Sequence, residues 1–376
     1  MTRLPRVRVV VLSRWYPSAA DPVAGVFVAD QVQALRKECD VQVLVPTAGG
    51  FAAAARFMPG RGGLDPIQRV PTPTGSLGFP LRLAAYARAL SRLGARKDEP
   101  VVVHVHLLLP DALPMLVAAR FHRIPVIVTE HVTFLAELVR SRRGRIQARL
   151  ALRLADAVVA VGAGLAQELR ELEPRARIRV IPNAVDTTVF APSTSPSRDF
   201  ALNVATRPGH DKGTDVLLRA WAAADGTLPP LVIVGDGPER PRYEQLASEL
   251  GIVPPRFVGH LDRGALVEML QNASFVVSSS RVESFGLAAI EALACGTPVV
   301  ATRTGEAARA VAPGLGLLVE PDDVEGMALA VSELARTFRS YDPVLLHEAM
   351  RARYGEEVVR DKLVGLYREV TAEALP

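Results

Sequence analysis

The stretch FVVSSSRVESFGLAAIEALACGTPVVAT, residues 275–302, decides the fold class of this chain of 376 residues. Its first residues, Phe275–Ser280, form a short apolar run that ends in three serines and predicts a buried strand. Pro298–Ala301 predicts a second strand, and the residues between them, Phe285–Ala294, have helical character that Gly296 ends. A strand, a helix and a second strand in this order make the unit from which parallel sheets are built. The stretch therefore predicts an α/β fold.

Two glutamates give the same stretch its chemical interest. Glu283 falls in the turn after the first predicted strand, where open α/β sheets bind their ligands. Glu291 falls inside the helix, in an apolar stripe, where a carboxylate is costly unless it is paired or hydrogen-bonded. The stripe consists of Leu287, Ile290 and Ala294. These residues alone leave two interpretations open: a turn residue with a boundary residue that reaches solvent, or two ligand-binding carboxylates.

Length and composition restrict the class of protein. A chain of this length suits two domains, and 49% hydrophobic with 22% charged residues indicates a globular protein. The net charge of +4 is too small to indicate nucleic-acid binding, and no nucleic-acid-binding motif is present. Cys39 and Cys295 are predicted to be reduced, buried thiols of a cytosolic protein. The N-terminal apolar run is interrupted by Arg8 and Arg14, so it predicts a first strand rather than a signal peptide. No apolar segment is long enough to cross a bilayer.

Short runs rich in β-branched residues recur through the first half of the chain, with helical patterns between them. Such runs predict parallel strands covered on both faces, and the alternation predicts a doubly wound domain. The predicted strands are Val7–Leu12, Val41–Val45, Val101–Val105, Val126–Thr129, Ala157–Val161 and Ile178–Ile181. The predicted helices are Val26–Lys37, Phe79–Leu93, Ala112–Phe121, Ile146–Leu154 and Gly164–Glu171.

Four residues of this half are candidates for contact with a ligand. Gly25 stands before the first helix, where it either brings an anion close to backbone N–H groups or serves only the geometry of the turn. His131 follows the fourth strand, at the ligand-binding edge of a parallel sheet. His104 lies within a strand and is interpreted as structural, while His106 fits either role. The spacing of His104 and His106, with no nearby cysteine, excludes a zinc site.

Residues 138–153 form a strongly basic segment of the first half. Ile146, Leu150 and Leu154 make an apolar stripe along its predicted helix. The segment is either a solvated helical face or a surface that contacts an anionic membrane or an acidic acceptor.

A stretch rich in serine, proline and threonine begins near Ala191 and predicts a linker, so the domains are expected at residues 1–190 and 191–354. A second α/β set follows, and the tail from Asp323 is helical, with a final amphipathic helix at Val358–Val370. The predicted strands are Ala201–Ala205, Leu231–Val234, Arg256–Val258, Phe275–Ser278 and Pro298–Ala301. The predicted helices are Thr214–Ala223, Arg240–Leu250, Arg263–Leu270 and the helix that bears Glu291.

The first turn of this second set, ATRPGHDKGTD, concentrates positive charge. Arg207 and Lys212 flank a Pro-Gly turn, and Gly213 precedes the next helix. Two cations beside a helix N-terminus suit a diphosphate, although a polar turn with solvated basic residues has the same composition. Gly235 and Gly237 lack the spacing of a dinucleotide fingerprint and are interpreted as turn residues that could also face a ligand.

The block ESFGLAAIE, a glutamate followed by seven residues and a second glutamate, resembles the E-x7-E motif of glycosyltransferase family 4. Other segments that resemble that family occur in its order along nearly the whole chain. They are PVAGVFVADQVQAL, HVH, TEH, ADAVVAV, RVIPNAVD, R-x4-KG, LVIVGDGP and RFVGHL. The resemblance implies the GT-B fold, in which two Rossmann-like doubly wound domains face a central cleft. It also implies that the final helix, about residues 355–376, packs back on the N-terminal domain.

The activity implied by the resemblance is that of a retaining glycosyltransferase. Such an enzyme moves a hexosyl or N-acetylhexosaminyl group from a nucleoside diphosphate sugar to an acceptor hydroxyl, and uridine is the commoner base in the family. The donor is a substrate, and no cofactor is required. The acceptor is either a lipid-linked saccharide at the inner membrane face or a soluble small molecule.

The resemblance assigns roles to individual residues. Arg207 and Lys212 would hold the diphosphate, Glu283 would meet hydroxyls of the transferred sugar, and Glu291 would bind the ribose. His131 would reach the donor from the N-terminal domain. The two carboxylates would then position the donor rather than act as the acid and nucleophile of a glycosidase. The other implied donor contacts are Gly25, Gly213, Phe257, Val258, Ser284, Phe285, Gly286 and Leu287.

The cationic pair replaces a metal in this interpretation. No Asp-x-Asp occurs in the sequence, so Arg207 and Lys212 are expected to stabilise the leaving diphosphate. Three positions depart from the family pattern: Ala24 precedes Gly25, Thr206 and Pro208 flank Arg207, and Val132 follows His131.

A nucleotide-sugar epimerase and a non-catalytic nucleotide-sugar-binding protein are the competing interpretations. The first needs acid and base residues that the sequence does not offer, and the intact charged set argues against the second.

Overall fold

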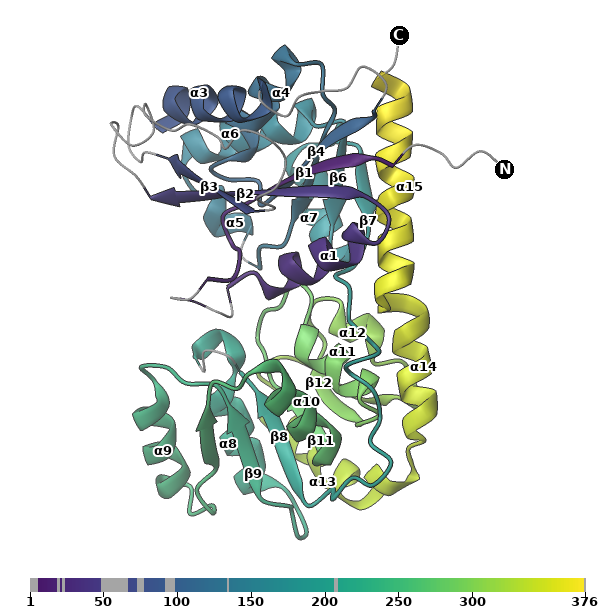
Figure 1. Cartoon of the computed structure of the whole chain (residues 1–376). Helices are drawn as coiled ribbons and strands as arrows, with labels where there is room; N and C mark the ends of the chain where they lie inside the picture. Colours follow the sequence, from purple (N-terminus) through teal and green to yellow (C-terminus); the bar gives the residue numbers. More distant parts are fainter. Residues whose placement is uncertain are drawn as a thin grey trace. The chain divides into compact units, whose positions relative to one another are not determined.

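The computed structural model describes residues 6–18, 21, 24–48, 67–72, 78–91, 99–133, 135–205 and 209–374 (Figure 1). The chain forms two compact units. Unit 1 contains Met1–Ala184 and Glu357–Pro376, and unit 2 contains Val185–Glu356. Each unit is an α/β layer structure around one parallel sheet, as the sequence predicts.

Unit 1 is built on a sheet of seven parallel strands in the order β3-β2-β1-β4-β5-β6-β7. The central strands β1, β4, β5 and β6 are apolar and almost wholly buried because helices cover both faces of the sheet, whereas the edge strands β3 and β7 are partly exposed. Their bounds are β1 Arg8–Ser13, β2 Asp40–Ala48, β3 Ile67–Thr72, β4 Val101–His106, β5 Val126–Glu130, β6 Ala157–Ala160 and β7 Ile178–Val180.

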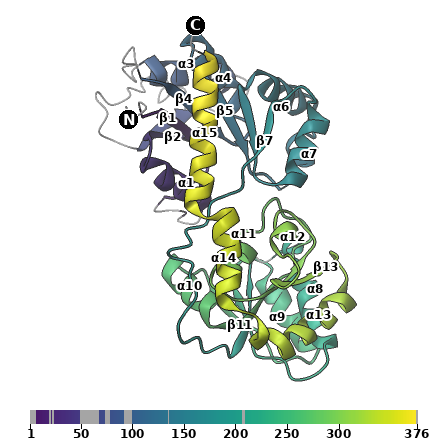
Figure 2. The same ribbon diagram turned by 90° about the vertical axis from the view of Figure 1, so that its right-hand side faces the viewer.

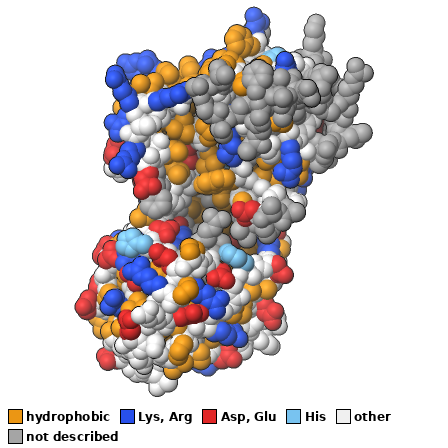
Figure 3. Space-filling view, turned by 90° about the vertical axis from the view of Figure 1, so that its left-hand side faces the viewer, with side chains coloured by type: hydrophobic (Ala, Val, Ile, Leu, Met, Phe, Trp, Pro, Cys, Tyr) orange, Lys and Arg blue, Asp and Glu red, His pale blue; other side chains and the backbone are white. Residues whose placement is uncertain are grey.

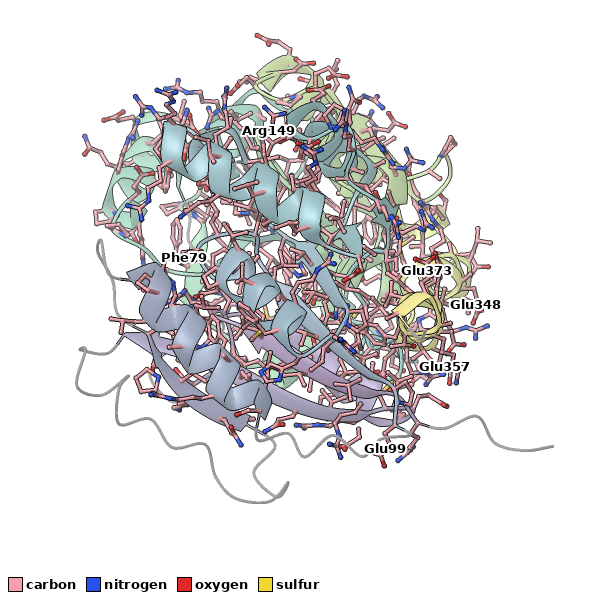
Figure 4. The ribbon with its side chains drawn as sticks, turned by 90° about the horizontal axis from the view of Figure 1, so that it is seen from above. Phe79, Glu99, Arg149, Glu348, Glu357 and Glu373 are labelled. Atoms are coloured by element: carbon pink, nitrogen blue, oxygen red, sulfur yellow. The ribbon has the colours of Figure 1, made fainter. Side chains whose placement is uncertain are left out.

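The helices of unit 1 lie on the two faces of this sheet. Val28, Val32 and Leu35 of α1 and Leu363 and Tyr367 of α15 bury their side chains in one core cluster with the strands. Figure 2 shows α15 lying over the sheet of unit 1. Helices α3, α4 and α6 pack side by side (Figure 4). The helices are α1 Val26–Arg36, α3 Gly78–Ser91, α4 Ala112–Phe121, α5 Leu135–Leu138, α6 Arg142–Leu154, α7 Ala163–Leu172 and α15 Glu356–Ala374.

Unit 2 is built on a sheet of six parallel strands in the order β10-β9-β8-β11-β12-β13. Trp221, Tyr243, Met327 and Leu334 form one core cluster, which joins helices α8, α9 and α13 to the sheet. The strands are β8 Phe200–Val204, β9 Leu231–Val234, β10 Arg256–Gly259, β11 Ala273–Ser278, β12 Val299–Thr302 and β13 Gly316–Val319. The helices are η1 His210–Lys212, α8 Thr214–Ala223, α9 Arg240–Glu249, α10 Arg263–Asn272, α11 Leu287–Ala294, α12 Ala307–Ala310, α13 Val324–Thr337, η2 Phe338–Ser340 and α14 Pro343–Tyr354.

Each sheet contains one place where the direction of strand addition reverses. In unit 1 the reversal lies between β1 and β4, and in unit 2 it lies between β8 and β11. The loops that leave such neighbouring strands diverge to opposite faces, which opens a crevice at the carboxyl ends where α/β proteins bind ligands. The fold therefore predicts ligand-binding sites at the loops after β1, β4, β8 and β11.

Two further features concern the cysteines and the length of the apolar helices. Cys39 and Cys295 are both free and buried, as expected for inert thiols. Among the described helices, none is both long and apolar enough to cross a membrane.

Candidate active site

The loops after β8 and β11 are locked together at the strand-order reversal of unit 2. Gly213 adopts φ +62°, and a Cβ atom at this position would lie 2.0 Å from the carbonyl oxygen of Ser279. The Ser279 hydroxyl donates a hydrogen bond to the carbonyl oxygen of Lys212 (3.0 Å). Only glycine fits this contact, and the contact brings the start of α8 against the end of β11.

Lys212 and Glu283, both predicted site residues, meet at this point. Lys212 Nζ lies 2.6 Å from Glu283 Oε1, and both side chains are partly buried. The Ser280 hydroxyl donates a second hydrogen bond to Glu283 Oε1 (3.1 Å). A partly buried, charge-assisted pair of this kind fixes the ammonium group in a defined position beside the loop.

Arg281 holds the two loops in register and was not predicted from the sequence. Its guanidinium donates to both carboxylate oxygens of Asp215 (2.8 and 2.9 Å), to Asp322 (2.6 Å) and to the carbonyl oxygen of His210 (2.5 Å). The hydrogen bonds from Arg281 hold the pKa of the Asp215 carboxyl below its usual value. Arg281 therefore orients Lys212 and Glu283 through the backbone rather than by direct contact.

Helix α11 starts beside this pair. Its N-cap, Gly286, adopts φ +85°, and a Cβ atom there would lie 2.7 Å from the Ala307 side chain. No side chain caps the helix. The first backbone N–H groups, those of Gly286 and Leu287, thus stand at the positive end of the helix dipole, where a negative charge is stabilised.

Glu291 lies on the margin of α11 and not inside its apolar stripe. Ile290 and Ala294 are fully buried, whereas Leu287 and Glu291, one turn apart, are half-buried. Burial, and then the nearby Glu291 carboxylate, raise the pKa of Cys295.

The remaining predicted donor contacts of unit 2 occupy different surroundings. The side chain of Phe285 is buried and packs edge-to-face on Tyr354 (centroids 5.8 Å apart), so only its backbone borders the loop. Ser284 is half-buried. Phe257 and Val258 lie on β10, two strands from β8, and the guanidinium of Arg240 covers the Phe257 ring at 5.2 Å. Arg207, with its neighbours Thr206 and Pro208, lies outside the described residues.

Gly25 has a packing role at the matching edge of unit 1. It adopts φ +67° as the N-cap of α1, and a Cβ atom would lie 2.2 Å from the carbonyl oxygen of Trp15. Glycine is required here by the close approach of two backbone segments. The Phe27 ring, in the first turn of α1, contacts the ring of His131 with centroids 4.5 Å apart. The structure therefore brings Gly25 and His131 to one edge of the unit 1 sheet.

Three buried histidines line the ends of β4 and β5. His106 Nδ1 lies 2.9 Å from His131 Nε2, so one of these nitrogens carries the shared proton. His104 contacts the hydroxyl groups of Tyr367 (2.7 Å) and Thr129 (2.6 Å), which confirms it as structural. Burial lowers the pKa of His104 to about 3 and that of His131 to about 3. Burial also lowers the pKa of His106, so all three imidazoles are neutral at pH 7.

Glu130 orients His131 and was not singled out from the sequence. Its carboxylate is fully buried and accepts hydrogen bonds from the backbone N–H groups of Leu108, His131 and Val132, each at 2.8 Å. Burial raises its pKa, and these three hydrogen bonds act in the opposite direction. An acidic residue at the end of a buried strand, directly before a histidine, is the signal that points to it.

The basic segment of unit 1 forms α6, whose N-cap Ser141 accepts a hydrogen bond from the Gly144 N–H (2.9 Å). Ile146, Leu150 and Leu154 all lie exposed on this helix.

In the described part of the chain, no cluster of three His, Cys, Asp or Glu side chains is arranged to hold a metal ion.

Comparison with known proteins addresses the family. The model of "Glycosyltransferase Family 4" matches residues 24–189, and that of "Glycosyl transferases group 1" matches residues 186–338. The D-inositol 3-phosphate glycosyltransferase of Acidothermus cellulolyticus is 31% identical over 78% of this chain and 73% of that protein. The glycogen synthase of Mycobacterium tuberculosis is 33% identical over 64% of this chain and 62% of that protein.

The fold is also found among solved structures. Anabaena Alr3699/HepE, solved in complex with UDP, aligns with a TM-score of 0.76 at 18% identity, over 96% of this chain and all of that one. Two parallel-sheet Rossmann-like units are thus the GT-B architecture that the sequence predicts. The two family models together match residues 24–338, and the D-inositol 3-phosphate relative is a glycosyltransferase. The chain belongs to the family 4, group 1 glycosyltransferases and is an enzyme of that type.

Proposed function

We propose that the protein is a retaining glycosyltransferase that transfers a hexosyl or N-acetylhexosaminyl group from a UDP-sugar to an acceptor hydroxyl. The observation that carries this proposal is the Lys212–Glu283 pair at the strand-order reversal of unit 2, beside the uncapped N-terminus of α11. A fixed cation and a helix N-terminus at one sheet edge suit a diphosphate. The UDP complex of the related fold supports a uridine donor.

The proposed roles divide the donor among the residues of unit 2. Lys212 and Arg207 neutralise the diphosphate, together with the N–H groups at Gly213, Ser284, Gly286 and Leu287. Glu283 accepts hydrogen bonds from the sugar, and Glu291, half-buried one turn into α11, accepts them from the ribose. Phe257 and Val258 border the base, while Phe285 supports the loop from below. From unit 1, neutral His131 contacts the sugar and Gly25 lets the start of α1 approach it.

Catalysis then consists of stabilising the leaving group. The bond between the sugar C1 and the diphosphate oxygen breaks, a bond from C1 to the acceptor oxygen forms on the same face, and the acceptor proton moves to a phosphate oxygen. Lys212 and the helix N-termini stabilise the negative charge that develops on the diphosphate. The cationic pair supplies this stabilisation without a metal ion. The named relatives suggest a sugar or polyol hydroxyl as the acceptor.

The test is a donor panel applied to the purified protein. UDP-sugars should raise the unfolding midpoint by mass action, and the matching donor should release UDP when an acceptor polyol phosphate or oligosaccharide is added. Proton NMR of the product should show the anomeric configuration of the donor. Protection by no nucleotide sugar, or a product with inverted configuration, contradicts the proposal.

A further inference from the structure

The outer face of α6 carries a row of apolar side chains that the fold leaves in solvent. Ile146, Leu150 and Leu154 follow one another at intervals of four residues, so they lie in one line along the helix. They are 51%, 44% and 38% exposed. The opposite face packs on the protein through Gly144, Ala148, Ala151 and Leu152. The apolar row is therefore the outermost line of the helix and cannot be covered by the core of unit 1.

Arginines lie along one side of this row and at its N-terminal end. At 100° per residue, Arg142, Arg149 and Arg153 fall on one side of the row, and Arg143 falls within the arc of the row, one turn before Ile146. Helix α6 contains five arginines and no acidic residue. Arg149 pairs with Glu173 (3.3 Å), whereas the described residues offer no ion-pair partner to the other four, Arg142, Arg143, Arg145 and Arg153. The positive charge of the face is thus largely uncompensated.

The neighbouring end of α4 extends the same chemistry. Helix α4 packs against α6, and Arg120 donates a hydrogen bond to the carbonyl oxygen of Leu154 (2.9 Å). The next residue, Phe121, is 76% exposed, and Arg123 is exposed as well. Figure 4 looks onto this layer and shows Arg149 on the outer side of α6. Figure 3 shows Lys and Arg side chains beside hydrophobic ones along the upper edge of the molecule.

We propose that this face, the row Ile146–Leu150–Leu154 with the arginines of α6, docks the protein on an anionic lipid bilayer. Apolar side chains along the crest of a helix insert at the boundary between headgroups and acyl chains, and flanking arginines bind lipid phosphates. Their long stems allow the guanidinium groups to stay at headgroup level while the crest inserts. The proposal goes beyond sugar transfer and does not depend on it.

The pattern of charge decides among the possible occupants. A second copy of the chain would bring two unpaired arginine sets face to face, which is repulsive. A nucleic acid or an acidic protein would bind the arginines, but it would leave the apolar row Ile146–Leu150–Leu154 exposed to solvent. An anionic bilayer satisfies both halves of the pattern, because it offers phosphates at the surface and hydrocarbon directly beneath.

The experiment measures cosedimentation of the full chain with vesicles, in the absence of any nucleotide. Vesicles of phosphatidylcholine alone are compared with vesicles that contain about 30% phosphatidylglycerol, an anionic lipid. The wild type should bind the anionic vesicles only. The variants Ile146→Gln/Leu150→Gln/Leu154→Gln and Arg142→Gln/Arg143→Gln/Arg153→Gln should each lower the partition coefficient by about tenfold or more.

A matched control removes apolar surface elsewhere. Val344→Gln/Leu345→Gln changes two residues of α14 that are 64% and 57% exposed and belong to no proposed site, and it should bind vesicles like the wild type. The proposal is overturned if the wild type binds neutral vesicles equally well or binds no vesicles. It is also overturned if binding is lost in the arginine variant but not in the Ile146/Leu150/Leu154 variant. A dimer in solution that the Ile146/Leu150/Leu154 variant abolishes would assign the face to a second copy instead. Because no donor is present, failure here is separate from failure of the donor panel.

Discussion

Among single residues, Lys212 is the side chain whose removal tests the site most directly. Its ammonium lies 2.6 Å from Glu283 Oε1 and next to the start of α11, where the diphosphate is proposed to bind. Lys212→Met keeps the aliphatic stem and removes the charge. We expect kcat to fall by ~100-fold or more, the effect of losing one stabilising group for a developing anion. Steady-state kinetics of UDP release measure the change.

The matched control is Lys362→Met, which removes an exposed lysine of α15 that has no role in the proposed site. It should leave kcat and KM unchanged. If Lys212→Met also retains full turnover, Lys212 does not stabilise the leaving group, and Glu283 loses its proposed partner in the active enzyme.

The sequence identified residues that carry a motif and missed those that support it. Lys212 and Glu283 stand out because charged residues follow strands in turns. Arg281, by contrast, is one arginine in a short turn, and its partner Asp322 is 41 residues away in the sequence. Glu130 was not predicted because its three hydrogen-bond donors are backbone N–H groups, and such partners cannot be identified from residue types. Supporting contacts of this kind depend on the folded chain.

At the scale of elements, Gly213 joins the start of α8 to the end of β11 and permits a test that separates strain from clash. Gly213→Ala imposes both the left-handed backbone penalty and a Cβ atom 2.0 Å from the Ser279 carbonyl oxygen. Gly251→Ala, at φ +65°, imposes the same backbone penalty in open space. We expect about 1 kcal/mol of destabilisation for Gly251→Ala and at least ~2 kcal/mol more for Gly213→Ala.

Urea unfolding of both variants is measured in a Trp15→Phe background, where the fluorescence comes only from Trp221, which is buried in unit 2. Gly213→Ala should also lose transfer activity, because the loop must shift away from β11 and take Lys212 with it. Equal stability of the two variants would show that the loop accommodates the extra atom and that the close contact does not position the site.

Element prediction succeeded where the pattern was long and apolar. The runs that became β1, β4, β5, β8, β9 and β11 were predicted within a few residues. β3 was not predicted because the strand Ile67–Thr72 contains an arginine and a proline and lies at the sheet edge. Helix α6 starts four residues before the predicted Ile146, since Ser141 supplies the N-cap through a contact that periodicity does not reveal.

At the scale of the whole molecule, the alternation of strands and helices predicted two doubly wound units, but not the order of strands in either sheet. That order depends on which crossover returns over which strand. It nevertheless decides function, because the reversals between β1 and β4 and between β8 and β11 place the site loops. The resemblance to a known family supplied what local patterns could not.

The buried histidines give the two units different responses to acid. An imidazole whose pKa is near 6.5 in the unfolded chain and about 3 in the folded one, as for His104 and His131, binds a proton only on unfolding between these values. Stability is therefore full above pH 6.5 and falls as pH drops toward 3, by up to about 1.4 kcal/mol per pH unit for each such group. His106 acts in the same direction.

We therefore expect unit 1 to unfold at progressively lower urea concentration as the pH falls from 7 to 5. Glu130 and Glu168, whose pKa values are raised by burial, oppose this trend, but they are two groups against three. In a Trp15→Phe background, tryptophan fluorescence comes from Trp221 alone and follows unit 2, whereas far-UV circular dichroism follows both units, so a transition seen by dichroism alone belongs to unit 1. His131→Gln removes one titrating imidazole and should make the pH slope shallower. A midpoint for unit 1 that does not move between pH 7 and 5 would mean that these imidazoles become protonated within the folded unit.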